Sequence, residues 1–120
     1  MNDASNVTVV TTPYVPAMKV EQTFGTVWGL VVRSRGLGGN LVAGLRSLVG
    51  GEIKEYTQLL EQARQHAMER LKENAAAVGA NAVVSMRFDS SELGQTMSEV
   101  VAYGTALQVV PDVDLDAIED

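Results

Sequence analysis

Residues 52–84 decide the fold, and they read EIKEYTQLLEQARQHAMERLKENAAAVGANAVV. Apolar side chains recur in this stretch along one stripe at helical spacing, widened by Leu59 and Met68: Ile53, Tyr56, Leu60, Ala63, Ala67, Leu71, Ala75 and Val78. Charged residues fall mainly on the other side, which is the pattern of an amphipathic helix. Gly79 then supplies the left-handed conformation in which many helices end. The stretch therefore predicts one long helix, Glu52–Val78, that passes through Gly79 into a strand.

Strand patterns lie on both sides of this helix. Upstream, Val7–Thr12 is β-branched throughout, and Val20–Ser34 alternates in polarity. We interpret the even positions of the second stretch as its apolar face: Val20, Phe24, Trp28, Leu30 and Val32. Gly25 and Gly29 lie on the other face, where they indicate a bulge or a close approach of another backbone. Downstream, Ala82–Asp89 and Met97–Val110 alternate as well, with a hairpin loop predicted at Ser90–Thr96.

The order of these elements predicts the fold class. Leu41, Leu45, Leu48 and Val49 recur at helical spacing and predict a short helix near Asn40–Val49. Two strands, two helices and two strands with short links predict an α+β fold, a mainly antiparallel sheet with one long and one short helix packed on it.

The last predicted strand is apolar on both faces. Val101, Tyr103, Leu107 and Val109 share one face, and Val100, Ala102, Gly104 and Ala106 share the other. A strand of this kind is covered on both sides. Since one helix covers one face of a small sheet, the second cover is the short helix, a neighbouring subunit, or both. This is the physical reason to expect a homo-oligomer.

Composition limits the domain organisation and the partners. The 120 residues fit one domain, 7–110, between an N-terminal segment 1–6 that we expect to be disordered and an acidic tail 111–120. The tail holds five of the fifteen acidic residues, so residues 1–110 carry a net charge of −1. The chain has no basic patch for nucleic acid, no apolar run of the ~20 residues that a membrane span needs, and no signal-peptide pattern in its first residues. We therefore expect a cytoplasmic protein with neither nucleic-acid nor membrane partners.

The residue inventory argues against most catalytic sites. Cysteine is absent, which excludes disulfides, thiolate metal sites and cysteine nucleophiles. The single histidine, His66, lies in the middle of the predicted helix, and no serine has the context of a nucleophile. We expect no catalytic residue and no cofactor. The weak metal candidates are Glu52, His66 and Glu99, which could form a site only if several subunits met around a symmetry axis.

A glycine-rich loop gives a second candidate site. Gly36-Leu37-Gly38-Gly39-Asn40 follows a strand and precedes a helix, as phosphate-binding loops do, but it lacks the third glycine and the Gly-Lys-Ser/Thr of the known fingerprints. A helix N-terminus beside arginines still favours anions. Trp28 could stack on a flat ligand or belong to the core. The candidate ligand-binding residues are Trp28, Arg33, Arg35, Gly36, Gly38 and Gly39.

Several segments together resemble the YbjQ-like family, which carries a heavy-metal-binding label. They are Thr11-Thr12-Pro13, Val31-Val32-Arg33-Ser34-Arg35, Leu48 to Thr57, Gly79-Ala80-Asn81-Ala82-Val83-Val84, Arg87-Phe88-Asp89 and Ala102 to Ala106, within about Val10 to Val110. The resemblance implies a subunit similar to the dodecin-like architecture and a ring-shaped homo-oligomer, a pentamer. No catalytic activity is established for the family. This chain has Leu30 where many relatives carry an acidic residue, and its lack of cysteine gives the metal label no support.

These observations lead to one functional hypothesis and two alternatives. We expect a non-enzymatic, homo-oligomeric cytoplasmic protein that binds a ligand or a partner as a ring. The first alternative is a metal-binding protein with sites at subunit junctions or on the symmetry axis. The second is a small-molecule or anion site formed by the Arg/Gly loop and Trp28.

Overall fold

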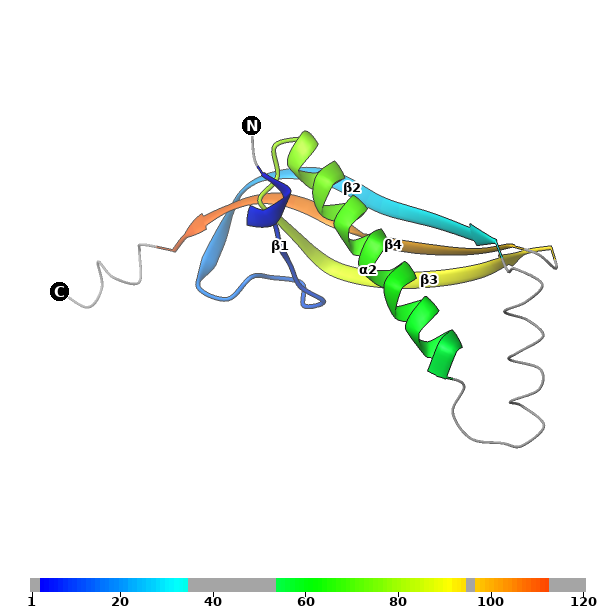
Figure 1. Cartoon of the computed structure of the whole chain (residues 1–120). Coiled ribbons are helices and arrows are strands. Elements are labelled where there is room, and N and C mark those ends of the chain that lie inside the picture. Colours follow the sequence, from blue (N-terminus) through cyan, green and yellow to red (C-terminus); the bar gives the residue numbers. More distant parts are fainter. Residues whose placement is uncertain (1–2, 35–53, 95–96, 113–120) are drawn as a thin grey trace.

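The computed structural model describes residues 3–34, 54–94 and 97–112 (Figure 1). Its elements follow in the order η1 (Ala4–Asn6), β1 (Thr8–Val9), β2 (Met18–Ser34), α2 (Lys54–Ala77), β3 (Ala82–Leu93) and β4 (Met97–Pro111). The short helix predicted at Asn40–Val49 lies outside the described residues. At the N-terminus, where we expected disorder, η1 is a short 3-10 helix capped by Asp3, whose side chain accepts a hydrogen bond from the Ser5 N–H at 3.0 Å.

The strands form one four-stranded sheet in the order β1-β3-β4-β2. Both β2 and β3 pair antiparallel with β4, as predicted, whereas β1 pairs parallel with β3. The sheet is therefore mixed, and α2 crosses one of its faces (Figure 1), which confirms the α+β class.

Two strand boundaries differ from the prediction. The first strand is limited to β1, because the chain beyond it bonds to a bulge in β3 instead of continuing the ladder. The N–H of Ser85 donates to Thr12 O at 2.8 Å and the N–H of Met86 donates to Val10 O at 3.1 Å. At the other end, β3 runs on to Leu93, so the hairpin loop is shorter than Ser90–Thr96.

The end of α2 is fixed by its glycine. Gly79 has φ +97, and its N–H donates to Ala76 O at 3.0 Å while the N–H of Ala80 donates to Ala75 O at 3.0 Å. These two bonds define a Schellman motif, which satisfies the last carbonyls of the helix. Asn81 then continues the sheet with its side-chain amide, which donates to Val109 O at 2.9 Å and accepts from Val109 N–H at 2.8 Å. The predicted passage from helix through Gly79 into a strand is confirmed.

The face of β2 that packs on α2 is the one that carries glycine. A Cβ atom added at Gly29 would lie well under 3.0 Å from the backbone of Ala67 and Leu71, so helix and strand backbones touch there. Val27 and Val31, on either side, are buried. The predicted close approach at Gly29 is confirmed.

The interpretation of the even positions as the buried face of β2 is wrong except at Phe24, which packs against the core, since Val20 is 55 % exposed. Trp28, Leu30 and Val32 are exposed on the side of the sheet away from α2. The reason is steric, because large side chains would hold the helix away from the strand, whereas Gly29 lets the alanine row of α2 come close.

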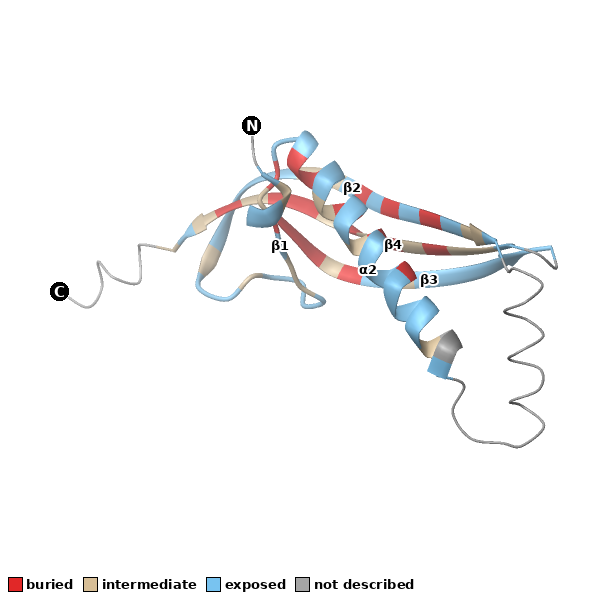
Figure 2. Ribbon diagram, in the orientation of Figure 1, coloured by how far each residue is buried: buried red, intermediate tan, exposed pale blue. Residues whose placement is uncertain are grey.

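Buried residues lie along α2 and the strands of the sheet (Figure 2), and they form an apolar core with two parts on the two faces of the sheet. The larger part lies beneath α2 and includes Leu71, Val83 and Ala102. The smaller part, on the opposite face, consists of Ala82, Val84, Leu107 and Val109, packed against Val10, Val15 and Met18. The predicted double cover of β4 is thus present at its C-terminal end. The second layer there comes from residues 10–18 of the same chain, a cover that the sequence did not suggest.

The backbone contact at Gly29 predicts a steep cost for any side chain at that position. We expect Gly29→Ala to lower the free energy of unfolding by about 3 kcal/mol, the upper end of overpacking costs, because the methyl group meets backbone atoms that cannot rotate away. Urea unfolding followed by circular dichroism measures this. The control is Gly94→Ala, where φ is +71 and no atom lies within 4 Å of the added Cβ, so only the backbone strain of about 1 kcal/mol applies. Equal losses in the two variants would contradict the contact.

Candidate functional site

Trp28 and Arg33 lie on opposite faces of β2. Side chains alternate along a strand, so positions five residues apart point to opposite sides. Trp28 is 57 % exposed on the face away from α2, whereas Arg33 is half-buried and contacts His66 of α2. One subunit therefore does not bring these two predicted ligand-binding residues into one site. The other members of the set, Arg35, Gly36, Gly38 and Gly39, lie outside the described residues.

Arg33 and His66 are joined by a hydrogen bond between Arg33 Nη2 and His66 Nδ1. A guanidinium can only donate, so Nδ1 accepts and the proton of the neutral imidazole is on Nε2. In this arrangement neither ring nitrogen offers a free lone pair to a metal ion. Arg33 Nε is buried and has no hydrogen-bond partner among the described residues. The pair joins the end of β2 to the middle of α2.

Two further side chains of α2 bind the free edge of β2. Because β2 is the last strand of the sheet, its outward carbonyls need donors from elsewhere. Arg70 Nη1 donates to Leu30 O, and Asn74 Nδ2 donates to Trp28 O at 2.6 Å. Sequence reasoning missed these residues. The available signal was the four-residue spacing of His66, Arg70 and Asn74 beside the apolar stripe.

An apolar strip remains open on the face of the sheet away from α2. Trp28, Leu30 and Val32 are 57 %, 40 % and 48 % exposed. On β4, Tyr103 pairs with Trp28 and Val101 pairs with Leu30, and both are half-buried. We call these five residues the open strip. It lies next to the smaller core but is not covered by residues 10–18, which pack further along the sheet.

The open strip is bordered by charged residues of β3 and β4. Arg87 and Asp89 pair with Tyr103 and Val101, and Glu99 pairs with Val32. The hydrogen bond from Tyr103 to Asp89, together with the negative charge of that carboxylate, raises the pKa of Tyr103 above its ordinary value, and Arg87 partly opposes the rise. The border therefore combines a carboxylate–phenol pair with an arginine and a second carboxylate.

The weak metal candidates are not brought together by the chain. Glu99 pairs with Val32 on the open face, whereas His66 is on α2 at the other side of the sheet. Glu52 lies outside the described residues. Over residues 3–34, 54–94 and 97–112, no three His, Asp or Glu side chains are placed to hold a metal ion.

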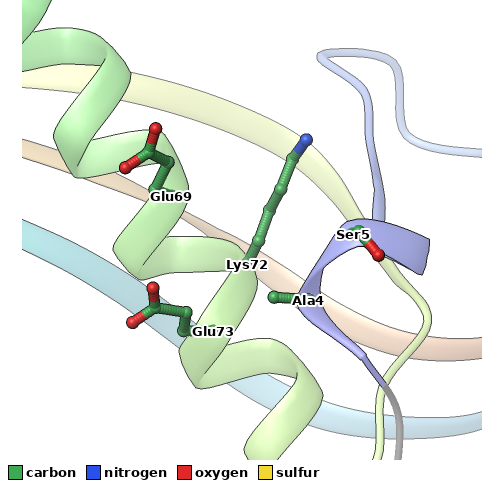
Figure 3. A pocket seen from close by; sticks show the side chains of 5 residues that line it. All are labelled: Ala4, Ser5, Glu69, Lys72 and Glu73. Carbon is green, nitrogen blue, oxygen red and sulfur yellow. The ribbon is translucent and has the colours of Figure 1, made fainter.

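A surface hollow lies between η1 and α2 (Figure 3). It is lined by Ala4, Ser5, Glu69, Lys72 and Glu73. Its charged groups are of both signs and all belong to α2, where Glu69 and Glu73 are exposed and Lys72 is half-buried. This composition offers a ligand no enclosed apolar surface, and we do not treat the hollow as a functional site.

The fold and the open face define a class of protein, a small α+β domain with one long helix on a four-stranded mixed sheet. None of the helices in the part of the chain that the structure describes has the length and apolar character needed to cross a membrane. The model of the YbjQ family, described as "Putative heavy-metal-binding", matches residues 7–110, and the chain belongs to this family. The resemblance seen in the sequence is confirmed.

Relatives and a solved structure agree with this assignment. A UPF0145 protein of Thermoplasma volcanium is 60 % identical over 116 residues, 97 % of this chain and 94 % of that protein. A UPF0145 protein of Thermoplasma acidophilum is 63 % identical over 105 residues, 88 % of each. A crystal structure of a DUF74-family protein of unknown function from Pediococcus pentosaceus superposes with a TM-score of 0.60 over 87 % of this chain and 98 % of that chain. Its sequence identity of 13 % limits that likeness to the fold.

The Tyr103–Asp89 pair predicts a pH effect with a definite sign. The folded state favours the neutral phenol, so its stabilising contribution is present below the unfolded pKa and is lost as the pH rises through the higher folded pKa. Asp89→Ala removes both the acceptor and the charge, and we expect the pKa of Tyr103 to fall. A pH titration of the Tyr103 ring signals by NMR measures this. Glu61→Gln, on the exposed side of α2, is the control, and an unchanged Tyr103 titration in Asp89→Ala would refute the pairing.

Proposed function

We propose that this chain is a non-enzymatic cytoplasmic protein that works as a homo-oligomer and buries its open strip in the contact between subunits. The observation that carries the proposal is the exposure of Trp28, Leu30 and Val32 on consecutive outward positions of one strand. Large contiguous apolar patches are uncommon on monomers and mark interaction sites. Tryptophan and tyrosine are also the residue types that most often dominate binding energy at interfaces.

The rest of the molecule supports this choice of surface. The face of the sheet beneath α2 is buried, and the far end of the opposite face is covered by Val10, Val15 and Met18. Neither of these layers covers the open strip, and the other exposed apolar residues of the strands, Val20, Leu93 and Met97, lie outside it. Residues 1–110 carry a net charge of only −1, so copies of the domain do not repel one another strongly.

The same residues support a non-catalytic role. The chain has no cysteine, and its one histidine has Nδ1 engaged by Arg33. A general base must be able to reach the proton of a substrate or a nucleophile. His66 is held against β2 by Arg33, and Asp89 accepts a bond from Tyr103. The family resemblance adds the ring shape and the pentamer to the proposal.

A small-molecule site, the second alternative, would use different residues from those predicted. A flat ligand could stack on Trp28 and Tyr103 beside Asp89, but one subunit cannot add Arg33 to that site, because Arg33 is on the other face of β2. A protein that stays monomeric would leave the strip free for such a ligand.

A charge placed in the open strip tests the proposed assembly. We expect Leu30→Asp to convert the oligomer to monomers in native mass spectrometry, because burying an unpaired carboxylate costs several kcal/mol. Val20→Asp is the matched control, since Val20 is on the same strand and 55 % exposed but lies outside the strip. A wild-type protein that is monomeric at micromolar concentration would refute the proposal, and so would a Leu30→Asp oligomer as stable as the wild type.

The metal alternative rests on the family description and needs residues from several subunits. We expect calorimetric titration of the oligomer with Zn²⁺ and Ni²⁺ to give no saturable heat, because the lone histidine is bound to Arg33 and thiolates are absent. Saturable binding that disappears in His66→Ala and persists in Lys72→Ala would establish the metal alternative instead.

A further inference from the structure

The chain exposes a second apolar surface at the beginning of α2. Leu59 and Leu60 are 45 % and 55 % exposed, and we call them the leucine pair. They continue the stripe whose later members, Ala63, Ala67 and Leu71, are buried against the sheet. Figure 1 shows the first turns of α2 projecting beyond β3, and the leucine pair belongs to this beginning of the helix. The helix is therefore apolar over a greater length than its own sheet covers.

The open strip and the leucine pair lie on different sides of the molecule. The strip is on the face of the sheet away from α2, and the pair belongs to α2, which packs on the other face. The two surfaces of one chain cannot meet each other. A face-to-face dimer through the strip would bury one of them and leave the other in water.

We propose that the leucine pair of one copy packs on the open strip of the next copy. This inference rests on the proposed homo-oligomer and names its contact. Because the two surfaces lie on opposite sides of the chain, this contact is heterologous, and it leads to a closed ring when the rotation between neighbours closes. Every copy then buries both its strip and its leucine pair, which a contact of strip with strip does not achieve.

The charges around the two surfaces favour the same pairing. Glu99 borders the strip and makes no ion pair within the described part of the chain. Arg64 is one helical turn beyond Leu60, and its guanidinium lies over the Phe88 ring, 5.3 Å from the centroid, while the side chain stays exposed. With the leucine pair on the strip, a basic residue of one copy lies near the acidic border of the next. Such complementarity directs partners and fixes their orientation.

The absence of cysteine makes the contact directly testable by disulfide formation. A disulfide forms only when two Cα atoms come within about 7 Å of each other. We expect the double variant Leu30→Cys/Leu60→Cys to give, under mild oxidation, a ladder of covalent species that ends at the closed ring. The single variants Leu30→Cys and Leu60→Cys stay uncrosslinked, because each then offers only one of the two surfaces. Leu30→Cys/Gln65→Cys, with the second thiol on the exposed side of α2, is the matched control and gives no ladder.

Three outcomes would overturn this contact. Crosslinked dimers of Leu30→Cys alone would show a face-to-face arrangement. An oligomer in native mass spectrometry with no ladder from the double variant would leave the proposed homo-oligomer intact and refute its contact. A monomeric wild-type protein would refute both proposals.

A second pair of variants avoids dependence on disulfide geometry. Leu30→Asp disables the strip and Leu60→Asp disables the leucine pair, so each alone is expected to be monomeric. Mixed in equal amounts, they retain one intact strip and one intact leucine pair between them, and we expect a one-to-one heterodimer. Circular dichroism spectra and melting curves like those of the wild type show that the variants are folded. Folded variants that form no heterodimer would contradict the heterologous contact.

Discussion

The contact between the backbone of α2 and Gly29 sets the arrangement of the molecule. Hydrophobicity alone favours burial of the even face of β2, since Trp28 and Leu30 are larger than the apolar residues on the odd face. The helix instead packs where the strand has no side chain, with Ala67 and Leu71 against Gly29 and valines on either side. In this structure the close packing of α2 on Gly29 takes the place of burying Trp28, Leu30 and Val32 under the helix. Those side chains are left in water, and the surface that they form is the feature from which we derive a function.

Local sequence patterns correctly predicted the elements that are determined by residues close together in the sequence. The stripe of α2, the Schellman motif at Gly79 and the alternation of β4 depend on neighbours within a few residues, and each was found where expected. Features that depend on residues far apart in the sequence were not predicted. The parallel pairing of β1 with β3 and the cover of Leu107 and Val109 by residues 10–18 arise from contacts across most of the chain. The sequence indicated that β4 needs two covers, but it contained no local signal for the segment that supplies the second.

For the candidate site residues, too, some features could be predicted from the sequence and others could not. The separation of Trp28 from Arg33 follows from strand parity and was open to prediction once Val20–Ser34 was interpreted as a strand. The bond between Arg33 and His66 was not, because it depends on where α2 crosses β2. The same holds for Arg70 and Asn74, which occupy outward carbonyls of the edge strand. These bonds limit pairing of that edge with another chain, since edge strands without such cover are open to further strands. They leave the face of the sheet, more than its edge, as the surface for association.

The division of residues between two faces has a consequence for every site considered for this family member. His66 and Glu99 are on opposite sides of one sheet, as are Arg33 and Trp28. Because the sheet lies between them, the two side chains of each pair cannot contact the same ligand within one subunit. They can share a site only across a subunit boundary, and only where the α2 side of one copy meets the open face of another. A face-to-face dimer places strip against strip and brings neither His66 nor Arg33 to the boundary. A heterologous contact through the first turns of α2 places the helix, with His66 about two turns beyond the leucine pair, beside the strip that Glu99 borders. If the protein binds a metal or an anion with these residues, the α2 side of one copy must therefore meet the open face of another.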